Sequence, residues 1–147
     1  MSIEEYWQSF LKEKGLPEDL RYYEAFAFGM TPEENDELLE LVLEGKKRAT
    51  TSAYLDAESY PHTGDCSIVL DGRGEARCII RTLKTTVMAF RDMTFDICKK
   101  EGEDECLETW QETHRNIFIE EGKELGYEFS EDMRIFFEEF ELVHINE

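Results

Sequence analysis

The chain has 147 residues and a formal net charge of -19, and 41% of its residues are hydrophobic. This length suits one domain, large enough to bury about two-thirds of the surface that the unfolded chain exposes. The hydrophobic content excludes an intrinsically disordered chain, and no apolar run approaches the roughly 20 residues needed to cross a bilayer. An acidic body repels long polyphosphate chains, so we expect neither long duplex nucleic acid nor a membrane among its partners.

The N-terminal region, about residues 1–30, is predicted to be helical. Apolar residues recur at helical spacing from Ile3 to Lys14, and Gly15 ends this run. Pro17 is predicted to begin a second helix that ends at Gly29. The sequence Thr31-Pro32-Glu33-Glu34 then has the form of a capping box, which predicts a third helix through Leu43.

After Gly45 the sequence becomes typical of strands and turns. Residues 49–54 are predicted to form a strand, and residues 56–64, with Pro61 and Gly64, a loop. The β-rich segments 66–70 and 76–90 flank Asp71-Gly72-Arg73-Gly74, which predicts a hairpin. Its second arm is long enough to bend or to pair with two partners.

The C-terminal third is predicted to contain a short helix over 93–100, a longer helix over 106–126 and a final strand over 134–145. Helices at the front, strands in the middle and a terminal helix and strand indicate the α+β class. We therefore expect one domain with a mixed or antiparallel, barrel-like sheet flanked by helices.

The chain carries no recognisable signature of a metal or cofactor site. Its four cysteines, Cys66, Cys78, Cys98 and Cys106, include no Cys-x-x-Cys pair, so we expect free and mostly buried thiols. A P-loop, a dinucleotide fingerprint, a nucleophile elbow and a His-rich motif are missing, so no metal or cofactor is expected. The N-terminus lacks the features of a secretion signal, which predicts a cytoplasmic protein.

A basic segment stands out from this acidic chain: Gly45-Lys46-Lys47-Arg48-Ala49-Thr50-Thr51-Ser52. Residues 45–84 hold seven basic and five acidic residues, whereas the rest of the chain holds 9 and 30. A lysine near other cations can act as a base, and a hydroxyl next to such a base can become a nucleophile, which makes Lys47 and Thr50 candidates. Alternatively, the cations complement the dipole at the end of the preceding helix.

Two further groups are candidates for a site. The acidic residues Glu101, Glu103, Asp104 and Glu105 could provide a proton donor, or they form a solvated loop that caps the next helix. Trp110 and His114 share a helix face at spacing i and i+4, where the histidine is either catalytic or hydrogen-bonded within the fold.

The order Phe28-Gly29, Asp36 to Gly45 and Lys47-x-x-Thr50 resembles an ASCH domain, a member of the PUA-like superfamily. The resemblance runs from about Tyr23 to Val143. Further segments that longer bacterial ASCH proteins share in this order are Pro61-x-x-Gly64-Asp65, Phe90, Glu101-Gly102-Glu103 and Leu107-x-x-Trp110-x-x-x-His114. This resemblance implies a small β-barrel flanked by helices, with a cleft lined by the Lys-x-x-Thr segment and a role in RNA binding or RNA metabolism.

Within that superfamily, short bacterial enzymes that remove the acetyl group from N4-acetylcytidine share the Gly-x-Lys-x-x-Thr segment. The resemblance implies Lys47 as proton acceptor, Thr50 as nucleophile and Glu103 as proton donor, with Glu101 as the alternative acid. The present chain is longer than those enzymes, and a shared fold does not establish a shared substrate.

The ligand implied by the resemblance is a nucleoside, a nucleotide or a short RNA. The protein would either hydrolyse an acylated pyrimidine nucleoside or bind its ligand without catalysis. Residues expected to contact it are Lys46, Arg48, Thr51, Ser52, Asp65, Arg81, Trp110 and His114. One alternative is a non-catalytic RNA-binding module in which four cations, Lys46, Lys47, Arg48 and Arg81, bind phosphates while Tyr54 or Tyr60 stacks on a base. Others are a single-strand ribonuclease that uses Lys47, Arg48 and His114, and a ligand-sensing or partner-binding domain. The sequence does not specify turnover or the oligomeric state.

Overall fold

The computed structural model describes residues 1–55 and 59–147, so the start of the predicted loop at 56–58 lies outside the described residues. The helices and strands in chain order are α1 (Ile3–Lys14), β1 (Ala25–Phe26), α2 (Pro32–Leu43), β2 (Ala49–Ala53), β3 (Cys66–Leu70), β4 (Ala76–Ala89), α3 (Phe95–Cys98), α4 (Leu107–Leu125) and β5 (Arg134–Ile145). Two 3-10 turns, η1 (Phe90–Asp92) and η2 (Lys99–Glu101), flank α3.

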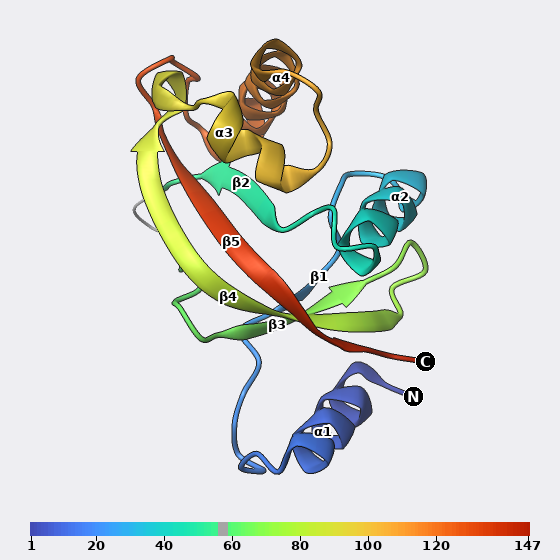
Figure 1. Ribbon diagram of the computed structural model, residues 1–147. Coiled ribbons are helices and arrows are strands. Elements are labelled where there is room, and N and C mark those ends of the chain that lie inside the picture. The colour runs from blue at the N-terminus through green and yellow to red at the C-terminus, as the bar shows by residue number, and fades with distance from the viewer. Residues whose placement is uncertain (56–58) are drawn as a thin grey trace.

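The strands form one sheet in the order β1-β3-β4-β5-β2. β1 is parallel to β3, and the other pairs are antiparallel. β4 and β5 are long, curved strands that cross the molecule together (Figure 1), and β4 pairs with both β3 and β5, as the hairpin prediction allowed. The mixed α+β fold is therefore confirmed. The sheet itself is open, because its edge strands β1 and β2 do not pair with each other, and the expected barrel is not formed by the described residues.

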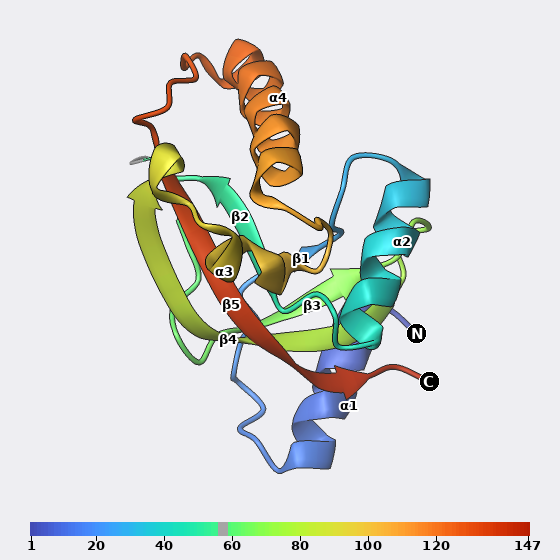
Figure 2. The same cartoon turned by 45° about the horizontal axis from the view of Figure 1, so that its top comes forward.

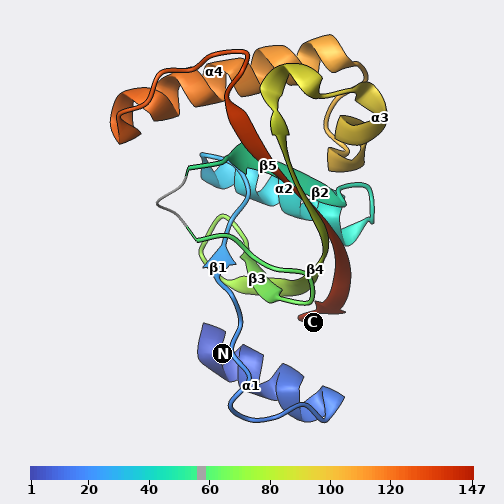
Figure 3. The same ribbon diagram turned by 90° about the vertical axis from the view of Figure 1, so that its left-hand side faces the viewer.

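Helices cover the two ends of this sheet. α1 lies at one end and α3 and α4 lie at the other (Figures 1 and 3). Buried aromatic residues of α1, among them Tyr6 and Trp7, pack with Ile68 and Ile79 of the sheet. α2 lies beside the β3–β4 hairpin (Figure 2), where the Gly72 amide donates a hydrogen bond to Asp36 Oδ1 at 2.8 Å. The burial of apolar surface in separate clusters on the sheet fixes these helices in place.

The predicted second helix over residues 17–29 is wrong. The segment instead begins with a turn, in which the Leu20 amide donates to the Pro17 carbonyl at 3.1 Å. Tertiary hydrogen bonds then hold it: Trp7 Nε1 donates to the Leu20 carbonyl at 2.8 Å, and the Tyr23 amide donates to the Cys66 carbonyl at 2.7 Å. Ala25 and Phe26 then pair with β3 as the short strand β1. Pairing with the sheet satisfies backbone groups that a helix would otherwise have paired internally.

The other predicted helices and strands are confirmed with shifts of a few residues at their ends. α1 begins with a complete capping box at Ser2 and ends at Gly15, whose φ of 67° suits glycine. α2 begins at Thr31, whose hydroxyl accepts a hydrogen bond from the Glu34 amide at 3.2 Å. None of the helices in the described ranges has both the length and the apolar character needed to cross a bilayer. The cysteines are free thiols, two of them buried and two partly buried.

Candidate functional site

The Lys47 side chain is buried where the chain passes from α2 to β2, and only 2% of its surface is exposed. Gly45, with a φ of 80°, allows the chain to turn after the helix. The Lys47 amine donates hydrogen bonds to the Ala49 carbonyl at 3.0 Å and to Glu103 Oε2 at 2.6 Å. It also lies 3.8 Å from Glu101 Oε1. These acceptors compensate for the loss of water around a buried ammonium group.

Glu101 is the most buried carboxylate of this cluster and connects β2 with α4. Its Oε2 accepts hydrogen bonds from Thr51 Oγ1 at 2.8 Å and from Trp110 Nε1 at 2.5 Å. Burial raises the pKa of Glu101, but hydrogen bonding to His114, the nearby Lys47 charge and the Trp110 bond together hold it below its ordinary value. Glu101 therefore carries a negative charge inside the protein.

His114 supports this carboxylate from α4. Its Nε2 lies 3.7 Å from Glu101 Oε1, its Nδ1 is 2.9 Å from the Trp110 carbonyl oxygen, and its ring stacks on the Trp110 ring at 4.3 Å. Burial lowers the pKa of His114, but Glu101 raises it, and the net pKa is above the ordinary value. Trp110 and His114 thus share a helix face, as their spacing predicts, and both contact Glu101.

Glu103 and Glu101 both contact Lys47, but they differ in access to solvent. The Glu103 side chain is 31% exposed, whereas that of Glu101 is 3% exposed. Glu103 is also the closer partner of the lysine amine. Of the two acids considered from the sequence, Glu103 is therefore the one that water or a ligand can reach.

Thr50 lies on the opposite face of β2 from Thr51, because successive side chains of a strand point to opposite faces. With Ser52 it lines a cleft of about 350 Å³ between β2, β5 and the segment around β1, which we call the β2–β5 cleft. Thr50 is opposite Glu138 in the antiparallel pairing, and Ser52 is opposite Phe136. The residues that line the cleft are Tyr23, Glu24, Phe26, Ala27, Phe28, Gly29, Thr50, Ser52, Ser59, Tyr60, Pro61, Phe136 and Glu138.

Aromatic rings form much of the wall of the β2–β5 cleft. The Tyr60 and Phe136 rings are 4.6 Å apart, and Phe26 meets Phe28 edge to face at 4.7 Å. Of the two tyrosines considered for base stacking, Tyr60 lines the cleft, and Tyr54 packs behind it against Phe136. Such walls suit a flat ring.

The structure divides the three predicted catalytic residues between two environments. Thr50 lines the β2–β5 cleft, and Lys47 does not. The Lys47 amine lies 5.0 Å from the centre of the ring of Phe28, which is one of the residues that line the cleft. Glu103 lies with Lys47. Among the described residues, no hydrogen bond joins Thr50 to Lys47 or to Glu103.

The other cations considered as ligand contacts are exposed and mostly paired. Lys46 lies 3.0 Å from Glu44, and Arg81 forms an ion pair with Glu141. Arg48 is exposed, and its backbone amide donates to the Lys100 carbonyl at 2.8 Å, which ties β2 to η2. The positive charge of this region is therefore spread over the surface or buried with carboxylates.

Asp65 and Glu138 belong to one acidic group, of which Glu138 lines the cleft and Asp65 does not. Asp65 accepts a hydrogen bond from the His62 amide at 2.8 Å. Glu138 is only 9% exposed, and its Oε2 accepts a hydrogen bond from Thr82 Oγ1 at 2.7 Å. The pKa of Glu138 is above its ordinary value, because burial and the nearby Glu24 and Asp65 carboxyl groups raise it more than the Thr82 hydrogen bond lowers it.

Sequence reasoning missed Glu138 and the aromatic residues around it. A signal was present in the alternation of β5, where Glu138 occupies the same face as Phe136 and Phe140 and is the charged member of a buried series. An acidic residue in such a position needs a partner or a function.

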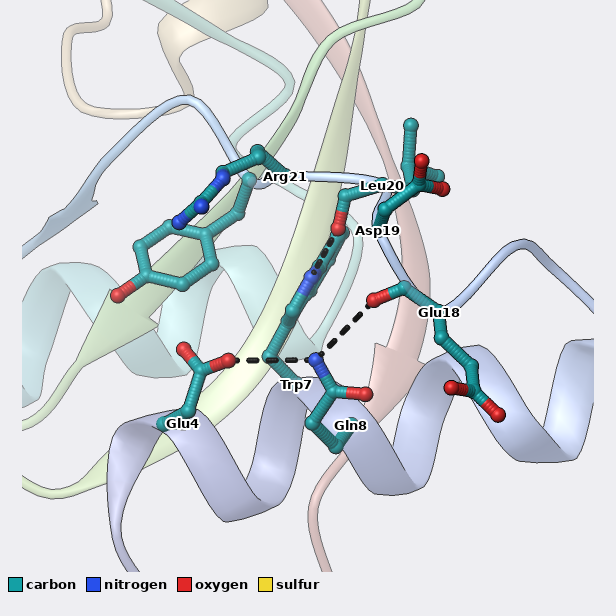
Figure 4. A pocket seen from close by; sticks show the side chains of 8 residues that line it. Glu4, Trp7, Gln8, Glu18, Asp19, Leu20 and Arg21 are labelled. Carbon is teal, nitrogen blue, oxygen red and sulfur yellow. Dashed lines mark hydrogen bonds between the residues drawn. The ribbon is translucent and has the colours of Figure 1, made fainter.

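A second hollow, of about 230 Å³, lies between α1 and residues 18–22 (Figure 4). The Gln8 side-chain amide donates hydrogen bonds to Glu4 and to the Glu18 carbonyl there. Trp7 also lines the hollow, and its Nε1 donates a hydrogen bond to the Leu20 carbonyl. These contacts hold α1 against the chain that follows it, at a distance from Lys47 and Thr50. In residues 1–55 and 59–147, no group of three or more His, Cys, Asp or Glu is arranged to hold a metal ion.

Comparison with solved structures gives several related proteins. A crystal structure of a protein from Enterococcus faecalis V583 is 31% identical, with a TM-score of 0.88 over 99% of this chain and 94% of that one. The ASCH domain from Lactobacillus crispatus JV V101 is 28% identical, with a TM-score of 0.85 over 98% and 96%. An ASCH mutant protein from Zymomonas mobilis shares the fold at 10% identity and a TM-score of 0.52, over 84% of this chain and 73% of that one. No curated protein matches the chain. The ASCH domain family matches residues 24–144, and the chain therefore belongs to this family.

Proposed function

We propose that this ASCH protein binds a nucleoside in the β2–β5 cleft and hydrolyses an acylamino group on its base. The observation that carries this proposal is the composition of the cleft, where the Thr50 hydroxyl stands among aromatic rings and hydrogen-bonding carboxyl groups. A volume of about 350 Å³ lies in the range of roughly 300–1,000 Å³ that is usual for small-ligand sites.

The charges favour a nucleoside over a polynucleotide. No Lys, Arg or His occurs among the described residues that line the cleft. Of the four cations considered for phosphate contacts, Lys46, Lys47 and Arg81 are each ion-paired with a carboxylate. A phosphate chain would have to break these pairs and approach an acidic surface. His114, which the ribonuclease hypothesis needs at a phosphate, is buried against Glu101.

In the proposed reaction, the Thr50 hydroxyl attacks the acyl carbon and the carbonyl oxygen takes the electron pair, giving a tetrahedral intermediate. Lys47 accepts the hydroxyl proton after its proton has passed to Glu103 along their hydrogen bond of 2.6 Å. The C–N bond then breaks, and the amine leaves with a proton from Glu103. Water hydrolyses the threonine ester, which releases the acid and restores Thr50. This sequence requires Lys47 to reach the cleft past Phe28.

The test is incubation of the purified protein with N4-acetylcytidine, with the absorbance followed as cytidine forms. We expect turnover by the wild type and a loss of at least about 100-fold in Thr50→Val, which keeps the shape but removes the nucleophile. Turnover should stay near normal in Thr113→Val, the same substitution at an exposed threonine of α4 outside the cleft. Binding of N4-acetylcytidine without turnover by the wild type would remove the hydrolase part of the proposal. Failure to bind any nucleoside would remove all of it.

A further inference from the structure

We propose that Glu138 is the specificity-determining residue of the β2–β5 cleft and that it selects a base with an amino or acylamino N–H over one with a keto oxygen at that position. The inference rests on the proposed function, because it concerns the base of a nucleoside bound in this cleft. It adds a residue that the Lys47, Thr50 and Glu103 assignment does not use.

The first support is the free acceptor that Glu138 presents. Its Oε2 is occupied by the Thr82 hydroxyl, whereas Oε1 has no hydrogen bond to a described protein group. Every fully buried side-chain nitrogen or oxygen that the structure describes has a partner, so Oε1 must be in contact with solvent. Since the side chain is 9% exposed and lines the cleft, Oε1 faces the cleft.

The second support is the lack of a cation for this carboxyl group. Among the described residues, Glu138 forms no ion pair, and the charged groups that act on its pKa are the carboxyl groups of Glu24 and Asp65, which raise it. A buried carboxyl group without a cation costs stability. A ligand that donates an N–H to Oε1 would supply the missing partner.

The third support is that the other cleft groups cannot make this choice. Aromatic faces stack on any base, and the hydroxyls of Thr50 and Ser52 both donate and accept hydrogen bonds. The Glu138 carboxyl group only accepts when it is ionised. Because its pKa is raised, the preference for an N–H belongs to the ionised form, and it is measured at pH 7.5 for this reason. An amino N–H therefore pairs with Glu138, whereas a keto oxygen would place two acceptors against each other. Leaving such buried groups unpaired costs about 1–3 kcal/mol, which corresponds to a roughly 5- to 150-fold difference in affinity.

Calorimetric titration with cytidine and uridine at pH 7.5 tests this, because the two ligands differ at the amino or keto position of the base. We expect the wild type to prefer cytidine by about tenfold or more. In Glu138→Gln, the amide both donates and accepts, so the preference should fall to about threefold or less. Glu141→Gln, an exposed change on the same strand, should keep the wild-type preference. Urea unfolding establishes that each variant folds.

The outcomes separate the inference from the function on which it rests. Equal affinity of the wild type for both nucleosides, or an undiminished preference in a folded Glu138→Gln variant, would overturn the role of Glu138 and leave nucleoside binding intact. Absence of wild-type binding to cytidine, uridine and N4-acetylcytidine would overturn both. If Glu138→Gln fails to fold, equal affinity of the wild type for the two nucleosides would still overturn the inference.

Discussion

At the scale of single residues, Glu101 is the buried carboxylate that contacts two neighbouring basic side chains. It interacts with Lys47 and His114, and all three side chains are buried. Removing one partner from a buried ion pair leaves an uncompensated charge, which is more costly than the pair itself is favourable. The cluster is therefore a structural requirement for placing Lys47, whatever chemistry the lysine performs.

This cluster predicts a defined pH range of maximal stability. His114 has a folded pKa above 6.5, so its contribution is complete below that pH and is lost as the pH rises through the folded value. Glu101 has a folded pKa below 4.5, so its contribution is present above that pH and is lost as the pH falls through the folded value. Both contributions are complete between about pH 4.5 and 6.5.

We therefore expect His114→Asn to lose more stability at pH 5.5 than at pH 9, as measured by urea unfolding. The exposed His62→Asn should show no such difference, because the His62 ring is 90% exposed. Loss of equal size at both pH values would contradict the prediction and would show that the packing of His114 against Trp110, and not its charge, stabilises the protein.

The residues of this cluster were identifiable from the sequence only as separate candidates. Spacing placed Trp110 and His114 on one helix face, and the basic segment singled out Lys47. Neither signal shows that Glu101 lies between them, because that depends on the approach of η2 to β2 across about 50 residues of chain. The alternation of β5 marks Glu138 as a charged residue in a buried series, but its place in the cleft depends on neighbours on other strands, such as Thr50 and Thr82.

At the scale of elements, the site depends on close contact between η2 and the chain that enters β2. The Arg48 amide donates to the Lys100 carbonyl. At Gly102, an added Cβ would lie 2.4 Å from the Lys46 carbonyl oxygen. This distance is below van der Waals contact with a backbone atom, so only glycine allows the two segments to lie together and bring Glu101 and Glu103 to Lys47.

Alanine at Gly102 should therefore destabilise the protein by more than its backbone conformation alone requires. Gly45 is the matched control, because its φ of 80° resembles the 75° of Gly102 while no atom lies within 4 Å of its added Cβ. We expect Gly45→Ala to cost about 1–2 kcal/mol in the free energy of unfolding, and Gly102→Ala at least about twice as much. Chemical denaturation measures both, and equal losses would show that the close contact is not needed.

The element predictions succeeded where local chemistry decides and failed where pairing with the sheet decides. Thr31 and Pro32 specify the start of α2 within a few residues of chain. Tyr22, Phe26 and Phe28 also have helical spacing, but β3 binds β1 in parallel and fixes them in an extended segment. A two-residue strand has no periodicity that a sequence can display. The open sheet has the same origin, because the pairing of edge strands is a long-range property.

At the scale of the whole molecule, the negative charge is only partly neutralised by ion pairs. The chain has 35 acidic and 16 basic residues, so many carboxylates have no cation. Most described pairs are exposed, where each contributes at most about 1 kcal/mol. Repulsion among the remaining carboxylates therefore opposes the compact state. We expect dissolved salt to weaken this repulsion more than it weakens the attraction within the ion pairs.

We accordingly expect the thermal midpoint at pH 7.5 to rise by a few degrees between 10 and 150 mM sodium chloride, as the screening length falls from about 30 to about 8 Å. Circular dichroism at several salt concentrations measures this change. Near pH 4.5, close to the isoelectric point of the sequence, the net repulsion is small and the salt effect should disappear. A midpoint that falls with salt at pH 7.5 would contradict the prediction, since it would mean that the ion pairs stabilise the fold more than the excess charge destabilises it.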